Sequence, residues 1–482
     1  MLTGVLLYDD DSVQQEWCEG EAMDFCDMLY RIITNHKLTI LSKNKNYLDF
    51  VNAMCTVGRQ LCSQMLSLVE ANHGNVESCS DDIGWREESL DKVLQGAILL
   101  VEDSQWLSIK QLQQSEWLSS LYTTYVHCRT KMARMEEHYL TASGTDLDEV
   151  REDIVEQEIE EQMTIVAIIG RETSLYKALE CLRDMFVQDT FPRLIAFLME
   201  KTSNSITAQG AALLEEARLG LVCITHLLTD DASGESPTIP EAIVREVESD
   251  ESGTVASLLT SLVVSCMTLA ECQASLLETS PNDPRLSPLL GKTLLRFLIR
   301  WAPAYIIPDD SYTATKQHLS LSGSNIQNMW SSQESAEQVV SFCVYLCFQY
   351  YCFWSSELQL QENATKLISA LVNRGPRMRH LLVISPPWER LVAAHILSTM
   401  SMQQSLEKNE EDDAYYGRIA NVIPNAMVAG YKRLPFRCRA EIFSTILTGC
   451  SSDDTNIQSA TMLNKSLEVV HSLFLKTVLG LG

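Results

Sequence analysis

The 482-residue chain carries 64 acidic residues against 37 lysines and arginines, which gives a formal net charge of −27. This surplus repels phosphate backbones and anionic lipids, so the composition argues against nucleic acids and membrane surfaces as partners and favours basic protein surfaces. Apolar residues make up 46% of the chain, which excludes wholesale disorder, and the length exceeds what one hydrophobic core normally serves.

Helical periodicity recurs along the whole chain, whereas the two-residue alternation of β-strands is rare. Polar stretches such as residues 72–82 separate the periodic segments. The apolar faces expected from the spacing are, in chain order, Ala22, Phe25, Leu29 and Ile32; Val51, Cys55, Cys62, Met65 and Val69; Leu175, Leu179, Leu182 and Phe186; Leu194 and Leu198; Val255, Leu259, Leu262, Cys266 and Leu269; and Leu463, Leu467, Val470 and Phe474.

Residues 209–240 combine a helix, an acidic loop and the start of a next helix. Gly234 and Pro237 stop the helical pattern, and Pro240 suits the first turn of the following helix. The first helix is predicted to be mostly buried, because one face carries Leu214, Ala217, Leu221, Ile224 and Leu228 and is widened by Val222 and Leu227.

Residues 284–308 contain another strongly apolar helix. Pro303 lies inside its pattern, which predicts a kink or a helix end near Trp301. Arg296 and Arg300 lie off the apolar face, which is formed by Leu290, Leu294, Phe297, Trp301 and Tyr305.

These segments predict an all-α fold, an α-solenoid of HEAT-like helical hairpin repeats. With a repeat of about 40–47 residues the chain would hold about 11 repeats. We expect helical repeats in residues 1–144, an acidic segment in residues 145–162, and a continuation of the solenoid in residues 163–482. Several unrelated all-α domains are the alternative.

The 15 cysteines lie mostly within apolar helical faces and lack CxxC spacing, so we expect small buried hydrophobes in a reducing compartment. The N-terminus lacks the basic region and cleavage site of a signal peptide. The most apolar run, residues 339–354, is too short to span a bilayer comfortably. We therefore expect a soluble intracellular protein without membrane insertion.

No pattern indicates catalysis or a bound cofactor. His127 and His138 are not spaced as metal ligands on a helix, and His226 and His395 sit in apolar helices, where a structural role is expected. Walker, nucleotide-binding GxGxxG and GxSxG patterns are absent from the sequence. The prediction is a protein that is not an enzyme and has no catalytic, cofactor-binding or metal-binding residues.

An acidic run is the most unusual chemical feature of the chain. It is either a solvated helix face or a contact for a basic protein partner, and the sequence leaves both open. Its members are Asp146, Asp148, Glu149, Glu152, Asp153, Glu156, Glu158, Glu160 and Glu161. A small basic patch is better explained as a helix C-terminus; it consists of Arg374, Arg377, Arg379 and His380.

Four stretches resemble, in the same order, the exportin-4 family of nuclear export receptors in the importin-β superfamily. They are IVAIIGR after the acidic run, LGLVCITHLLTDDASGESPTIP, GKTLLRFLIRWAPAY, and WSSELQLQENATKLISALVNRGPRMRHLLVISPPWE. The resemblance covers roughly residues 85–392. Full-length exportins are longer, so it implies a central segment without the N-terminal repeats that hold the GTPase Ran.

The resemblance implies a monomeric carrier that takes protein cargo from nucleus to cytoplasm with Ran-GTP. It also implies contacts with the Phe-Gly repeats of nuclear-pore proteins, and shuttling between nucleus and cytoplasm. A helical-repeat scaffold that binds proteins without Ran is the first alternative. An all-α enzyme with a site built from scattered carboxylates is the second.

Overall fold

The fold was analysed in a computed structural model. It describes residues 18–103, 106, 116–144, 149–200, 205–230, 237–306, 333–354, 357–373, 378, 381, 382, 384–388 and 391, without the side chains of 149–156, 333 and 334. Of the described residues 86% are helical, and no β-strand occurs among them. This confirms the all-α prediction.

The helices are joined mostly by short connections, so neighbours in the chain form helical hairpins. One 3₁₀ turn, η1 (Glu77–Cys79), precedes α5, and one π-helical segment, η3 (Arg183–Thr190), precedes α9. The α-helices of the described residues are α2 (Glu19–Asn35), α3 (Leu38–Leu41), α4 (Tyr47–Ala71), α5 (Ser80–Val101), α7 (Trp117–Ser143), α8 (Glu149–Leu182), α9 (Phe191–Met199), α10 (Ala208–Leu228), α11 (Glu241–Ser249), α12 (Thr254–Thr279), α13 (Pro288–Tyr305), α15 (Gln333–Phe353) and α16 (Leu358–Asn373).

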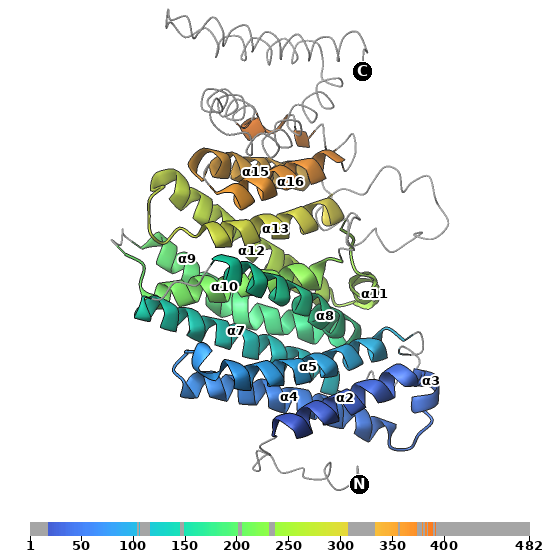
Figure 1. The fold of residues 1–482 in the computed structure, drawn as a ribbon. Coiled ribbons are helices and arrows are strands. Elements are labelled where there is room, and N and C mark those ends of the chain that lie inside the picture. The colour runs from blue at the N-terminus through green and yellow to red at the C-terminus, as the bar shows by residue number, and fades with distance from the viewer. Residues whose placement is uncertain are drawn as a thin grey trace, which may run out of the picture. The chain divides into compact units, whose positions relative to one another are not determined.

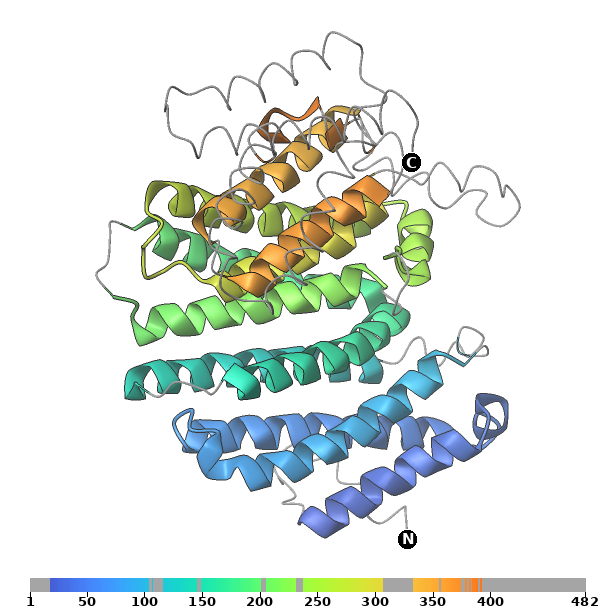
Figure 2. The same cartoon turned by 45° about the horizontal axis from the view of Figure 1, so that its top comes forward.

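The chain divides into two compact units. The first comprises Met1–Asp230, Ile239–Leu269 and Asp283–Leu290, and the second comprises Asp231–Thr238, Ala270–Asn282 and Gly291–Gly482. In the first unit α2 packs on α5, α5 packs on α4, and α7 lies between α4 and α10. Figures 1 and 2 show these helices stacked in successive layers that follow the chain order. This layering of hairpins is the HEAT-like arrangement that the periodicity predicts.

Helix α10 is the most deeply buried element of the first unit, because α7, α8 and α9 all pack on it. The Thr207 side chain accepts a hydrogen bond of 3.1 Å from the Gly210 amide and caps its N-terminus. The predicted apolar face is buried throughout, and the helix ends at Leu228 as predicted. Pro240 precedes α11 by one residue.

Close packing explains a glycine in the middle of α10. A Cβ atom at Gly220 would lie 2.4 Å from the nearest atom of the Phe186 ring. Phe186 is fully buried and stands against Phe191, with the ring centroids 6.0 Å apart. The segment η3–α9 can therefore approach α10 only because this position lacks a side chain.

Aromatic stacking and one polar contact organise the described part of the second unit. The rings of Phe297 and Trp301 stack at 5.9 Å, and those of Trp301 and Tyr305 stack at 6.0 Å. Helices α15 and α16 pack together, and the Gln361 side-chain amide donates hydrogen bonds of 2.9 and 2.8 Å to the carbonyls of Tyr350 and Trp354. Gln361 thus satisfies the carbonyls at the end of α15.

Two details differ from the sequence prediction. Helix α13 continues past Trp301 and ends at Tyr305, with Pro303 in its last turn, so the helix end predicted near Trp301 comes too early, whereas the alternative of a kink there stays a prediction. Proline removes one backbone donor, its own, which does not force the helix to end before it. Helix α2 buries Ala22, Cys26, Leu29 and Ile33, whereas Phe25 and Ile32 are half-buried. The apolar stripe of α2 is wider than the part of it that is buried. Packing on α5 buries Cys26 and Ile33, each of which follows directly after a residue that the spacing predicted to be buried.

The remaining expected faces divide into confirmed ones and ones that the structure does not describe. Those on α4, α8, α9, α12 and α13 are buried as predicted. Leu463–Phe474, the basic patch at Arg374, Arg377, Arg379 and His380, and His395 lie outside the described residues. The predicted limits of the acidic segment, residues 145 and 162, stay a prediction. Helix α8 runs through residue 162 without a break.

Among the described helices, one is long and apolar enough to cross a bilayer by length and composition alone. This helix is α12, whose most apolar window has a mean hydropathy of 1.7. The run at residues 339–354, which is the most apolar run picked out from the sequence, does not meet the same criterion. Of that window 44% is buried within the protein, and Leu259, Leu262 and Cys266 are completely buried. The core helix of a globular protein has the same composition, so this is weak evidence for a membrane span.

Candidate protein-interaction site

The acidic run forms the beginning of α8. Gly144 ends α7 in the left-handed conformation, with φ of 68°, and α8 begins at Glu149. Asp146 and Asp148 lie outside the described residues, whereas the other seven acids belong to the helix. Carboxylates in the first turn of a helix are favoured by its macrodipole, and Glu149 and Glu152 stand in the first turn of α8.

The described acidic side chains of this run lie on different sides of α8. Ile159 and Met163 are buried against the rest of the first unit, and Glu158 and Glu161 are exposed. The Gln157 side chain donates a hydrogen bond of 2.9 Å to Glu161. Glu158 and Glu161 are therefore accessible to solvent.

Glu160 differs from its neighbours because it contacts a buried histidine. His226 of α10 is 4% exposed, and its Nε2 atom lies 2.5 Å from a Glu160 oxygen. Its Nδ1 atom lies 3.1 Å from the hydroxyl of Thr164, which donates to the Glu160 carbonyl. The structural role predicted for His226 is confirmed, and Glu160 joins α8 to α10.

A buried arginine fixes the same two helices farther along α8. Arg171 is 5% exposed, donates a hydrogen bond of 2.7 Å to the His226 carbonyl and pairs with Asp230 just beyond the end of α10. The indole of Trp106 donates to the Glu172 carbonyl at 3.1 Å. The run is thus the N-terminal part of a helix that is firmly held on its inner side.

The sequence could not reveal the contacts of Glu160 and Arg171. His226 is 66 residues from Glu160 and 55 residues from Arg171. Only the packing of α8 on α10 brings them together, and no local spacing signals it. The one signal in the sequence was His226 near the end of an apolar helix, because a buried histidine needs a polar partner.

The described residues contain no group of three or more His, Cys, Asp or Glu side chains that could hold a metal ion. The predicted buried cysteines are buried and unpaired with other cysteines. Burial raises the pKa of Cys55 and Cys343 to about 12, so these thiols stay protonated at neutral pH. Such thiols behave as small apolar groups, not as nucleophiles or metal ligands.

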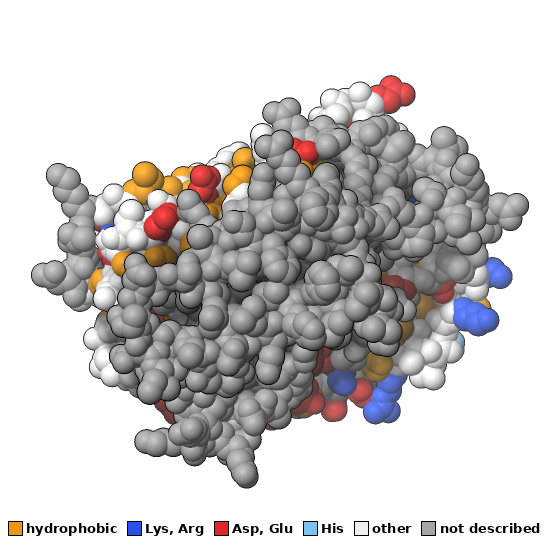
Figure 3. Space-filling model, turned by 90° about the horizontal axis from the view of Figure 1, so that it is seen from above, with side chains coloured by type: hydrophobic (Ala, Val, Ile, Leu, Met, Phe, Trp, Pro, Cys, Tyr) orange, Lys and Arg blue, Asp and Glu red, His pale blue; other side chains and the backbone are white. Residues whose placement is uncertain are grey.

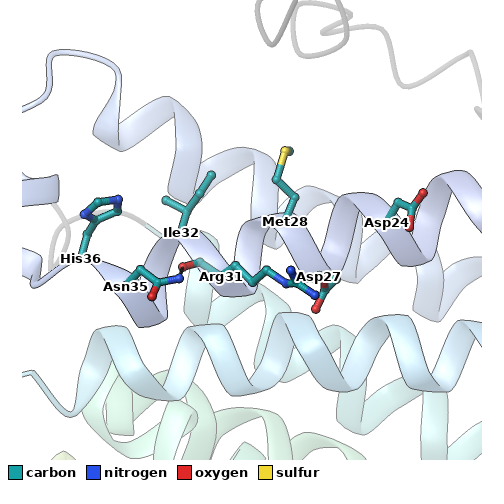
Figure 4. A pocket seen from close by; sticks show the side chains of 7 residues that line it. All are labelled: Asp24, Asp27, Met28, Arg31, Ile32, Asn35 and His36. Atoms are coloured by element: carbon teal, nitrogen blue, oxygen red, sulfur yellow. Dashed lines mark hydrogen bonds and ion pairs between the residues drawn. The ribbon is translucent and has the colours of Figure 1, made fainter.

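A shallow hollow of about 380 Å³ lies on the outer face of α2. Figure 4 shows six of its lining side chains along α2 and His36 just after the helix, with Asp27 beside Arg31. These two groups form an ion pair of 2.6 Å, and Arg31 is largely exposed. A solvated, open surface of this kind does not enclose a small molecule.

A family model described as Exportin-4 matches residues 3–409, which is most of the chain. The chain belongs to the exportin-4 family. Exportins are nuclear transport receptors and not enzymes, so family membership assigns the chain a karyopherin-type role in transport. The match includes the acidic run on α8 and all the described helices.

The surface in Figure 3 mixes side chains of several kinds. Among the described residues visible there, acidic, basic and apolar side chains are interspersed. A mixed, charged surface is typical of transient protein interfaces, in which charged rims orient the partner.

Proposed function

We propose that this chain acts in nuclear export, carrying protein cargo from nucleus to cytoplasm through the nuclear pore together with Ran in its GTP form. The single observation that supports it is the exportin-4 match over residues 3–409. The stacked hairpins of the first unit agree with it, because helical repeats offer extended surfaces on which a folded protein can bind.

The proposed mechanism is coupled binding without catalysis. Cargo and Ran-GTP favour the same arrangement of the helical repeats, so each raises the affinity of the other. Hydrolysis of GTP in the cytoplasm releases Ran. The helical repeats then no longer favour the arrangement that binds cargo, so the cargo is released as well. Contacts with Phe-Gly repeats carry the complex through the pore, and the receptor then returns to the nucleus.

We further propose that the acidic run on α8 contacts a basic surface of Ran or of cargo. Glu158 and Glu161 are exposed, and Glu160 and Arg171 hold the helix on α10. The helix therefore presents these charges from a fixed position. The chain's charge of −27 adds a general attraction for basic proteins, and such fields speed the first encounter.

The test is to immobilise the chain joined to the N-terminal repeats that the family resemblance places before it, and to compare the proteins that it retains with Ran-GTP and with Ran-GDP. The proposal predicts a set of proteins whose retention rises with Ran-GTP. Retention that is independent of the nucleotide would favour a helical-repeat scaffold without Ran dependence. Photobleaching of the tagged chain in one compartment of living cells tests shuttling separately, because exchange between nucleus and cytoplasm does not depend on knowing the cargo.

A further inference from the structure

Two free thiols meet in the core of the first unit, where α7 packs on α4. Cys62 of α4 is completely buried, and Cys128 of α7 is 2% exposed. The Cys128 thiol donates a hydrogen bond of 3.1 Å to the Cys62 carbonyl, across 66 residues of sequence. The side chain of Cys62 lies close by as well, because the two thiols also share a hydrogen bond. The fold thus brings two cysteines from distant segments into contact.

A glycine allows the two helices to approach this closely. Gly58 lies one helical turn before Cys62 on α4, and a Cβ atom there would lie 2.7 Å from the Leu121 side chain of α7. Beside it, the Arg59 guanidinium donates a hydrogen bond of 3.4 Å to the Ser120 hydroxyl of α7. The backbones are therefore near enough for side chains as short as cysteine to meet, and a polar contact holds the register.

A guanidinium group gives this pair a chemistry that differs from that of an isolated buried thiol. The hydrogen bond from Cys62 lowers the pKa of Cys128 against the effect of burial, and the charge of Arg129 lowers it further. Arg129 pairs with Glu87 and is 16% exposed, so the thiols lie close to the surface. Cys55, two turns before Cys62, is just as buried, and burial raises its pKa to about 12. Cys128 therefore has the thiolate character that Cys55 lacks.

We propose that Cys62 and Cys128 form an oxidation site, at which hydrogen peroxide produces a disulfide that joins α4 to α7. Peroxide is close to water in size, so a local opening beside Arg129 is sufficient for it to enter. Disulfides of proteins in reducing compartments are usually transient and redox-sensing, and exchange with a small thiol reverses them. The site requires neither Ran nor transport, and so goes beyond the proposed function.

The reaction has two steps that together consume one peroxide. The Cys128 thiolate attacks one peroxide oxygen, the O–O bond breaks, and the leaving hydroxide takes up the proton that Cys128 released; Cys128 is then a sulfenic acid. The Cys62 sulfur attacks the Cys128 sulfur, the S–S bond forms, the S–O bond breaks, and the hydroxyl leaves as water with the Cys62 proton. Two electrons pass from the sulfurs to the peroxide, and the products are one disulfide and two waters.

The test is to expose the full chain to hydrogen peroxide, block the remaining thiols with N-ethylmaleimide in denaturant, and digest the product for mass spectrometry. Cys62 and Cys128 should be lost from the free thiols in equal amounts and appear as one cross-linked peptide pair that dithiothreitol separates. Their loss should be at least about tenfold faster than that of Cys55, because the thiolate fraction falls tenfold for each unit of pKa, which outweighs the lower nucleophilicity of a less basic thiol. Cys55 lies on the same helix as Cys62 and is the matched internal control.

Variants distinguish cross-linking from oxidation of one thiol. In Cys62→Ser the second step is lost, so the sulfenic acid of Cys128 should accumulate and react with dimedone, which should label little of Cys128 in the wild type. Cys55→Ser makes the same change on the same helix and should leave the cross-link unchanged. If circular dichroism shows that Cys62→Ser has lost helix, Cys62→Ala replaces it, and the wild-type comparison with Cys55 decides in either case.

Any of three results would overturn the proposal. The first is loss of Cys62 and Cys128 that is no faster than loss of Cys55. The second is oxidation of Cys128 in the wild type to sulfinic acid without the cross-linked peptide pair. The third is equal dimedone labelling of Cys128 in the wild type and in the folded Cys62 variant, which would show that Cys62 does not resolve the sulfenic acid.

Discussion

Replacing Arg285 by alanine is expected to open the connection between α12 and α13 within the first unit. The Arg285 side chain is 2% exposed and forms a two-pronged pair with Asp283, with N–O distances of 2.8 and 2.7 Å. It also donates hydrogen bonds of 2.9 and 2.8 Å to the carbonyls of Phe197 and Glu200, at the end of α9. One buried side chain thus joins this connection to α9.

The expected cost follows from what Arg285→Ala leaves behind. The Asp283 side chain is 1% exposed, so it becomes a buried charge without its partner, and two helix-end carbonyls lose their donor. Breaking a buried ion pair in this way costs about 3–5 kcal/mol. Arg285→Lys keeps the charge but cannot make all four bonds, and should cost about 1–3 kcal/mol.

The pH dependence has a definite sign. The hydrogen bonds from Arg285 and its positive charge hold the pKa of the Asp283 carboxyl below its usual value. The stability from this depressed pKa is fully present above the unfolded value of about 3.9 and is lost as the pH falls through the lower folded value. The difference in stability between the wild type and Asp283→Asn should therefore be constant from neutral pH to about pH 5 and shrink below about pH 4.

Hydrogen exchange followed by mass spectrometry measures both the size and the place of the effect. Protection should fall at the end of α9 and in residues 280–290, while α4 and α5 keep theirs, because repeat arrays confine damage to neighbours. Arg193→Ala, which removes an exposed pair between Arg193 of α9 and Asp189 of η3, is the control and should cost less than about 1 kcal/mol. Equal effects of Arg285→Ala and Arg193→Ala would refute the reasoning.

Three further predictions concern the core and the acidic run. Leu221→Ala, at a completely buried site of α10, should cost about 2–5 kcal/mol, with loss of exchange protection concentrated in neighbouring helices; uniform loss would indicate one cooperative globule. Gly220→Ala should cost about 1–3 kcal/mol because its Cβ meets the Phe186 ring, whereas Gly84→Ala, with nothing within 4 Å, should be neutral or stabilising in thermal melting. Replacing Glu152, Asp153, Glu156 and Glu158 with Gln together should slow association with Ran-GTP or cargo at low salt and matter less at high salt. The association is measured with the chain joined to the N-terminal repeats that the resemblance places before it, and unchanged rates at low salt would make the run a solvated face. Glu248→Gln and Glu251→Gln, at exposed positions on α11 and just after it, are the controls.

The sequence predicted the elements that depend on local spacing. The buried face and the end of α10 follow from apolar steps of three and four and from the turn formers after Leu228. On α2 the same logic chose Phe25 and Ile32, whereas Cys26 and Ile33 are buried. Ala22, Phe25, Cys26, Leu29, Ile32 and Ile33 form an apolar stripe wider than one face of that helix, so the partner helix decides which part of the stripe is covered.

The sites depend on packing between distant segments, which spacing does not encode. Glu160 belonged to a recognisable acidic run, but its contact with His226 required α8 and α10 to be placed together. Local rules predict a helix and its exposed side, and tertiary structure decides which groups meet there.

The most direct test of the proposed export function is the affinity of one Ran-dependent cargo for the chain joined to the N-terminal repeats that the family resemblance places before it, measured with and without Ran-GTP. Coupled binding predicts that Ran-GTP raises cargo affinity about 5-fold to 150-fold, and that cargo raises Ran-GTP affinity by the same factor, because binding free energies are linked. Ran-GDP should leave cargo affinity unchanged. Equal cargo affinity with Ran-GTP, with Ran-GDP and without Ran would contradict the proposed mechanism.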